Sequence, residues 1–232
     1  MQDRQKQIMQ ALVEAYIAYH EPVSSGFLSR YFEDEWSSAT MRNDLADLLR
    51  QGYVKKIYCS SGSVPTAKAY QFFVDAVLDL EHAHVQESRD GAFQSLEDAA
   101  RFVADRTESM NILIDEHMNM ALDGIEELFA QPDFSTRDEY RALARMIDGI
   151  RDERANLFRA FFDREPSVFV GDANPMRSLD VETSLFTTGV KTADGTRVVS
   201  LLVGPARMPY QRNWDAFWSA RNRLARSRPK TT

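Results

Sequence analysis

The 232-residue sequence contains one cysteine, Cys59, and only four histidines. A single cysteine excludes an internal disulfide framework and a cysteine zinc cluster, which agrees with a reducing compartment. The sequence also lacks any run near the roughly 18 apolar residues that a membrane helix needs, and residues 1–7 are too polar for the core of a signal peptide. We therefore expect a cytoplasmic protein that does not bind membranes.

Residue patterns for catalysis and metal binding are equally scarce. His82 and His84 lie two residues apart on a predicted helix and so face different ways, and His20 and His117 do not complete a metal set. No phosphate loop, metalloprotease helix or Ser/His/Asp order occurs in the sequence. The segment 171–175 is a better match to a turn after a strand than to a phosphate loop. We expect no enzyme activity, no metal site and no cofactor.

The acidic net charge of −7 argues against a general nucleic-acid coat, because nonspecific affinity comes mostly from cations that displace phosphate counterions. The acidic excess is unevenly distributed. Residues 1–75 carry eight Lys and Arg against nine Asp and Glu, a balance of −1, and the other 157 residues carry 20 against 26, a balance of −6. The N-terminal part can still be a sequence-specific reader that uses a few well-placed cations.

Residues 1–75 show the element order of a winged helix-turn-helix DNA-binding domain. Apolar spacing, serine caps and Gly52 predict three short helices, a strand, a turn and a return strand, followed by a further helix. Their expected ranges are 4–19, 24–32 and 39–51 for the helices, 53–58 and 64–65 for the strands around a turn at 60–63, and 67–85 for the last helix.

The third helix is the one expected to read DNA. Met41, Leu45 and Leu48 lie at helical spacing and form its predicted buried stripe, so the opposite face carries Ala39, Asn43, Ala46 and Arg50, with Thr40 and Arg42 on the flanks. Asparagine pairs well with adenine, and arginine with guanine or phosphate. The complete set of candidate DNA-binding residues is Ser37, Ser38, Ala39, Thr40, Arg42, Asn43, Arg50, Lys55, Lys56, Ser63, Thr66 and Lys68.

Several segments resemble the bacterial heat-inducible transcription repressor HrcA family. Its N-terminal domain is similar to residues 21–25, 37–45, 52–53, 60–62, 64–66 and 70–75, and the motif Ser37-Ser38-Ala39-Thr40-Met41-Arg42-Asn43-Asp44 is highly specific. Near the C-terminus, residues 203–210 are similar to the family segment Gly-Pro-x-Arg-Met-x-Tyr, and residues 170–175 resemble a family turn.

The resemblance implies a dimeric repressor that binds an inverted-repeat operator upstream of chaperone genes. It also implies a GAF-like second domain and a functional link to a GroEL-type chaperonin. The wing departs from the family pattern, since Ser63 and Tyr58-Cys59 stand where members usually have an arginine and a His/Thr pair. Loss of such cations weakens phosphate or minor-groove contact.

Residues 76–232 are expected to form a mostly helical dimerisation region and a small antiparallel, reduced GAF-like sheet, which makes the chain an α+β protein. Helices are predicted over 95–106, 116–129, 136–162 and 210–226, and strands over 167–170, 181–186 and 198–203, with a short strand at 111–114. The aromatic residues Trp214, Phe217 and Trp218 suit core packing better than a ligand box. The basic tail, Arg221 to Lys230, suits a solvated helix end better than a binding surface.

Two apolar stripes in the middle of the chain are candidates for the dimer interface. One joins Leu122, Ile125, Leu128 and Phe129, and the other joins Leu143, Met146, Ile147 and Ile150. Either stripe can equally be part of the intrachain core. A rival interpretation of the whole protein is a protein-interaction adaptor, in which the winged helix has lost sequence-specific DNA binding.

Overall fold

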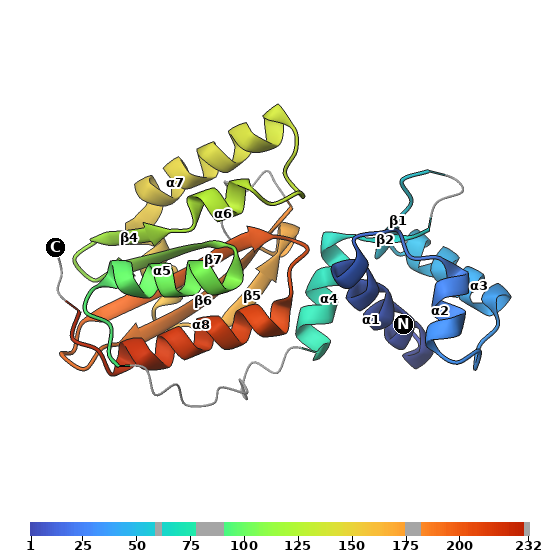
Figure 1. Ribbon diagram of the computed structural model, residues 1–232, viewed down its shortest axis with the longest axis horizontal. Coiled ribbons are helices and arrows are strands. Elements are labelled where there is room, and N and C mark those ends of the chain that lie inside the picture. Colours follow the sequence, from blue (N-terminus) through green and yellow to red (C-terminus); the bar gives the residue numbers. More distant parts are fainter. Residues whose placement is uncertain (59–61, 78–90, 175–181, 230–232) are drawn as a thin grey trace. The chain divides into compact units, whose positions relative to one another are not determined.

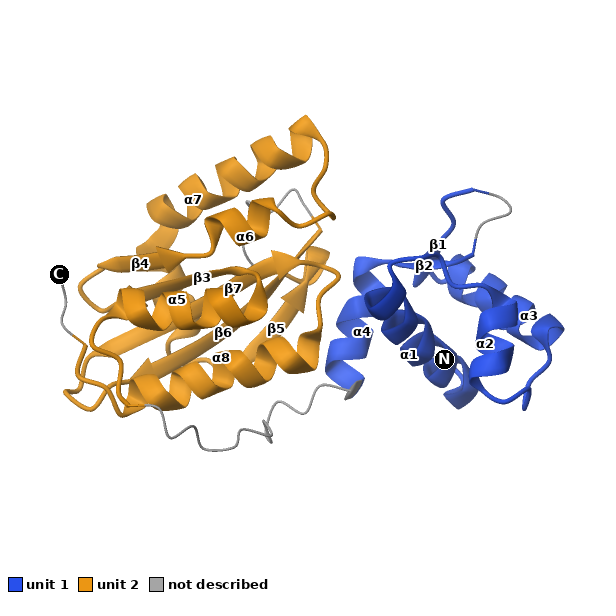
Figure 2. Cartoon of the chain, in the orientation of Figure 1, with its two compact units in different colours: residues 1–78 blue, residues 79–232 orange. Residues whose placement is uncertain are grey.

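The computed structural model describes residues 1–58, 62–77, 91–174 and 182–229. They belong to two compact units, residues 1–78 and 79–232 (Figure 2). Cys59, His82, His84 and Lys230 lie outside the described residues, as do parts of the predicted turn at 60–63, the helix at 67–85 and the strand at 181–186. No helix in the described part of the chain is long and apolar enough to cross a membrane.

Unit 1 contains four helices and a short hairpin among its described residues, in the predicted order. The elements are α1 (Asp3–Tyr19), α2 (Ser25–Tyr31), α3 (Ser38–Arg50), β1 (Val54–Lys55), β2 (Val64–Pro65) and α4 (Ala67–Val77). The predicted serine caps are present, since the Ser24 and Ser37 hydroxyls accept hydrogen bonds from Phe27 N and Thr40 N at 3.0 and 3.2 Å. The three N-terminal helices meet in a core of fully buried side chains: Ile8, Leu12, Leu28, Met41 and Leu48.

The hairpin is shorter than the predicted strand at 53–58. Only Val54 and Lys55 pair with the return strand, because the chain before β2 pairs with a different partner. Val23 and Ser63 exchange two backbone hydrogen bonds, of 2.9 and 2.7 Å, across an isolated antiparallel bridge. Residues 56–58 are therefore exposed and lie outside the sheet.

Unit 2 is built on a five-stranded antiparallel sheet with the strand order β4-β3-β7-β6-β5. The strands are β3 (Met110–Asp115), β4 (Met120–Asp123), β5 (Ser167–Val170), β6 (Thr183–Lys191) and β7 (Arg197–Pro205). A single 3-10 turn, η1 (Gly171–Ala173), follows β5 where a turn was predicted. The long central strands β6 and β7 are almost entirely buried, so both faces of the sheet must be covered.

Helices cover both faces of this sheet (Figure 1). One face carries α5 (Leu96–Thr107) and α8 (Tyr210–Ala225), and the other carries α7 (Arg137–Phe161) with the short α6 (Ile125–Phe129). On the first face the rings of Trp214 and Phe217 pack around Phe186 with centroids 6.1 Å away and are almost fully buried. These two aromatic residues belong to the core, as predicted, whereas Trp218 is only half-buried and stacks on Trp214 with ring centroids 5.5 Å apart.

The predicted helix over 116–129 is wrong. The Asp115 carboxylate accepts hydrogen bonds from His117 N at 2.9 Å and Asn119 N at 2.8 Å, and Met118 adopts a left-handed backbone. This turn reverses the chain, so that β4 returns beside β3. After β4, the backbone of Gly124 lies so close to Ser109 that a Cβ atom on Gly124 would be 2.3 Å from the Ser109 carbonyl oxygen. Helix α6 begins directly after this glycine. The middle region therefore supplies two strands of the sheet, β3 near the predicted strand at 111–114 and β4 within the predicted helix, while α5 and α7 are helical as predicted.

Neither apolar stripe forms the free helix face that a dimer interface requires. The residues of the first stripe do not share one helix, since Leu122 lies on β4 and Leu128 lies on α6, where it is fully buried. The second stripe forms one face of α7, as predicted. This face packs in one hydrophobic cluster with β3, β6 and β7 through Leu143, Met146, Ile147 and Ile150. Burial of α7 against its own sheet satisfies the apolar face that the sequence pattern shows.

We predict that Leu143→Ala lowers the free energy of unfolding by about 2–5 kcal/mol, because it leaves a cavity between α7 and the sheet. Asp148→Ala, an exposed change on the same helix, should alter it by less than about 0.5 kcal/mol. Chemical denaturation of both variants at two protein concentrations is the measurement. A loss for Leu143→Ala that vanishes at the higher concentration would place this stripe in an interface and contradict the fold.

Candidate nucleic-acid interface

Helix α3 divides into a buried and an exposed face as the sequence predicts. Met41, Leu45 and Leu48 are buried against unit 1. On the opposite side lies the reading face, which we define as six exposed residues of α3 and its N-terminal cap: Ser37, Ala39, Arg42, Asn43, Ala46 and Arg50. Leu49 is exposed beside them. Ser38 and Thr40 are half-buried beside it. The apolar stripe thus fixes which side chains α3 offers to a ligand.

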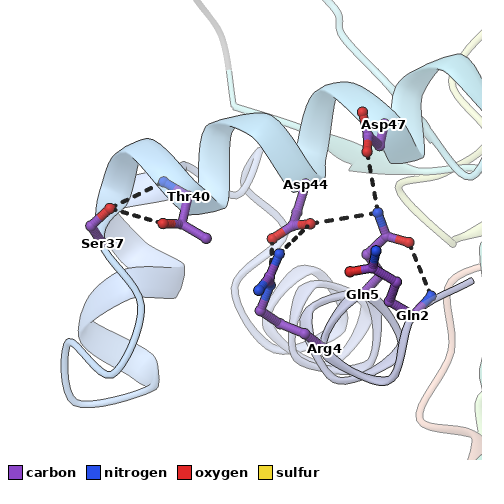
Figure 3. Close-up of polar contacts among 7 residues, drawn as sticks. All are labelled: Gln2, Arg4, Gln5, Ser37, Thr40, Asp44 and Asp47. Carbon is purple, nitrogen blue, oxygen red and sulfur yellow. Dashed lines mark hydrogen bonds and ion pairs between the residues drawn. The ribbon is translucent and has the colours of Figure 1, made fainter.

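A buried carboxylate, which the sequence analysis missed, locks α3 onto α1. Asp44 is only 4% exposed and accepts hydrogen bonds from Arg4 Nε at 2.8 Å and Arg4 Nη2 at 3.3 Å (Figure 3). Gln5 Nε2 lies 3.5 Å from Asp44 Oδ1 and 3.4 Å from Asp47 Oδ2. The helical spacing could have predicted this burial, since Asp44 follows Met41 by three positions and so falls on the buried side of the helix.

This contact also sets the electrostatics at the start of α1. The hydrogen bond to Asp44 and its negative charge raise the pKa of the Arg4 guanidinium, so the pairing favours the charged form that arginine has anyway. The pairing neutralises a carboxylate that would otherwise lie inside unit 1 without a partner. The negative charge of Asp44 is thereby kept away from the reading face.

The N-terminus of α3 is held by hydroxyl groups. Ser37 Oγ lies 3.0 Å from Thr40 Oγ1 while it caps the backbone N–H of that residue, as Figure 3 shows. Ser38 Oγ lies 3.3 Å from Ser25 Oγ of α2, which ties the two helices together at this end. Ser37 and Thr40 therefore order the helix start, and the exposed Ala39 between them leaves room for close approach.

Arg42 and Lys56 line one groove between α3 and the hairpin. The groove has a volume of about 250 Å³, and its lining also includes Ala46 and Leu49 of α3 with Ser24 and Ser25 at the start of α2. Arg42 Nε makes only a long contact, 3.4 Å, to the Ser38 carbonyl oxygen and is exposed. The lining of this groove thus includes one cation from α3 and one from the wing segment, the name we give to residues 55–58 after the expected wing.

The remaining candidate cations have mixed positions. Lys55 is exposed on β1, and Arg50 pairs with Asp47 one turn before it on α3. Lys68 is exposed, but its ammonium group donates to the Gln51 carbonyl oxygen at 2.9 Å and lies 4.4 Å from the centre of the Tyr53 ring. Lys68 therefore caps the C-terminal end of α3.

Two candidates have structural positions that the sequence did not indicate. Ser63, one of the candidate DNA-binding residues, is 2% exposed and its backbone pairs with Val23, so its side chain is not offered to a ligand. The bridge to Val23 draws this residue into unit 1 instead. The Thr66 hydroxyl donates toward the carbonyl oxygens of Gly52 and Tyr53 at 2.8 and 3.0 Å, which fixes the chain after α3.

Comparison with known proteins identifies the family. The sequence model described as "HrcA protein C terminal domain" matches residues 66–213. The chain belongs to the HrcA family. The match includes the segment 203–210 that resembled this family, and it reaches from the end of unit 1 through the whole described sheet of unit 2.

Curated HrcA relatives match a shorter stretch. The heat-inducible transcription repressor HrcA of Corynebacterium diphtheriae is 43% identical over 86 residues, 37% of this chain and 25% of that protein. The protein of the same name from Clostridium acetobutylicum is 37% identical over 87 residues, 38% of this chain and 25% of that protein. The chain thus spans about a quarter of the length of these relatives in the matched segments.

One solved structure shares the fold at low sequence identity. It is titled "Crystal structure of a hypothetical protein at 2.2 A resolution" and aligns with a TM-score of 0.78 and 17% identity, over 97% of this chain and 96% of that chain. At this identity the likeness supports the fold alone.

We predict that Ser63→Arg destabilises unit 1 by about 1–3 kcal/mol, because a long charged side chain cannot fit the buried site beside Val23. Ala18→Arg adds the same charge at an exposed position of α1 and should leave stability within about 0.5 kcal/mol. Thermal and urea unfolding of both variants are the measurements. An unaffected Ser63→Arg would mean that residue 63 is on the surface after all.

Proposed function

We propose that the protein is a transcriptional repressor that binds double-stranded DNA through α3, the reading helix of a winged helix-turn-helix in unit 1. The observation that carries the proposal is the reading face itself. A capped helix, anchored by its apolar stripe and by Asp44, offers Ala39, Arg42 and Asn43 at its N-terminal half. This is the half that enters the major groove in helix-turn-helix proteins.

Each residue of that half suits a distinct contact. Asn43 is exposed in the middle of the face and can accept from and donate to an adenine edge, and Arg42 can reach a guanine or a phosphate. Ala39 can touch a thymine methyl group, and the free N–H groups at the Ser37 cap can face a phosphate. Lys55 and Lys56 add positive charge from the wing segment.

The regulated genes are inferred from the family. The matched relatives are named heat-inducible transcription repressors, and we propose the same role for this chain, at an inverted-repeat operator of heat-shock or chaperone genes. A cytoplasmic location follows from such a role. The dependence on a GroEL-type chaperonin, the GAF-like character of unit 2 and the assignment of dimerisation to residues 76–232 are further parts of this proposal.

A protein-interaction adaptor is the second candidate function, and one observation favours it. The turn between α2 and α3 exposes three consecutive acidic residues, Glu33, Asp34 and Glu35, and the first two have left-handed backbone angles of φ 50° and 59°. Carboxylates close to a DNA-reading helix repel the DNA phosphates and so weaken binding. An adaptor should show no preference for an inverted repeat over scrambled DNA.

We predict that Asn43→Ala and Arg42→Ala each weaken specific DNA binding by about 1–3 kcal/mol without unfolding the protein, because both side chains are exposed on α3. The target DNA is first selected from genomic fragments with the purified protein, and gel shifts are then run at several salt concentrations. Gln7→Ala, an exposed change on α1, is the matched control. Wild-type affinity in both α3 variants would exclude this helix as the reader.

We also predict that the protein is a homodimer assembled through unit 2, because linking two weakly charged readers raises their apparent affinity for a two-fold symmetric site. Light scattering at micromolar concentration should give twice the chain mass of 26.5 kDa. A mass of one chain, combined with one protein per site on the selected DNA, would refute the dimer and leave the role of α3 untouched.

A further inference from the structure

The wing segment places two large apolar side chains in solvent. Ile57 is 53% exposed and Tyr58 is 74% exposed, and both directly follow the cations Lys55 and Lys56. Tyr58 has the largest exposed fraction among the big hydrophobic residues of the described chain. Exposed apolar residues that adjoin one another commonly mark a binding surface.

The groove lined by Arg42 and Lys56 lies next in the chain to Ile57 and Tyr58. Its lining includes Arg42 of α3 and Lys56, the residue directly before this pair. In DNA the sugar-phosphate backbone separates the major groove from the minor groove. A backbone strand seated in this groove would contact both cations, and with α3 in the major groove the residues that follow Lys56 would face the adjacent minor groove.

We propose that Ile57 and Tyr58 form an apolar wedge against the minor groove, with Lys56 on the neighbouring phosphate. The inference rests on the proposed function and adds a second, chemically different contact to it. Apolar side chains inserted at a minor groove partly unstack a base step and bend the duplex, which is easiest at flexible pyrimidine–purine steps. The wedge thus selects DNA by its deformability.

This contact fits the charge of unit 1. Residues 1–75 have a balance of −1, so counterion release by cations supplies little affinity. Apolar contact with bases does not depend on displaced counterions, so its contribution persists at higher salt. In this proposal, apolar contacts from residues 57–58 replace the cationic contact that family members usually make with a wing arginine.

The test uses the full chain and the DNA that it selects. Ile57→Ala and Tyr58→Ala should each weaken binding by about fivefold or more, the loss expected when an aromatic or apolar contact to a base is truncated. The slope of log K against log salt should stay at the wild-type value, and the DNA bend measured by energy transfer between labelled ends should decrease. Lys56→Ala should instead reduce that slope by about one unit.

Tyr19→Ala, which removes an exposed aromatic ring of α1, is the matched control and should bind as wild type. Wild-type affinity and bending in the two wing variants, while Asn43→Ala still weakens binding, would overturn the wedge and leave the proposed function standing. Absence of any DNA preference in the wild-type chain would overturn both. Thermal unfolding of each variant confirms that a lost affinity does not reflect a lost fold.

Discussion

The orientation of α3 depends on one ion pair between a buried carboxylate and a partly exposed arginine. Arg4 and Asp44 join α1 to α3 with an Nε to Oδ2 distance of 2.8 Å, and the carboxylate lies among the buried residues of an otherwise apolar stripe. An apolar stripe alone tolerates small rotations of a helix, because hydrophobic contact is not directional. A hydrogen-bonded charge pair does not tolerate them, since a rotation would leave Asp44 buried and unpaired. The exposed positions of Arg42 and Asn43 follow from this constraint.

The second unit satisfies a different constraint, which is that a sheet with buried central strands needs cover on both sides. The apolar faces of α5 and α8 cover one side and the apolar face of α7 covers the other. The stripe on α7, which resembled an interface, is therefore used inside the chain. Surfaces open to an assembly of two copies include the polar outer face of α7 and the edges of the sheet.

Charge and apolar surface are distributed unequally within unit 1. The acidic turn at 33–35 precedes α3, whereas Arg42 and Lys56 line the groove beside it and Ile57 and Tyr58 extend beyond. A surface with few cations can bind DNA selectively only if its other contacts are well matched to the bases. In the proposed function the helix would contribute polar groups for base edges, and residues 57–58 would contribute apolar groups.

The sequence by itself determined the local features of this protein. Serine caps, apolar spacing and the glycine after α3 are short-range signals, and they predicted the helices of unit 1, the buried stripe of α3 and the long helix α7. Tertiary structure decided what depends on partners distant in the sequence. Residues 116–129 became a turn, a strand and a short helix because β3 offered a pairing edge and Asp115 capped the turn. Ser63 became buried because Val23, forty residues earlier, took its backbone hydrogen bonds, and Asp44 became a structural contact because Arg4 lies forty residues before it. Periodicity reports which face of an element is apolar, but only the packed fold specifies which surface covers that face.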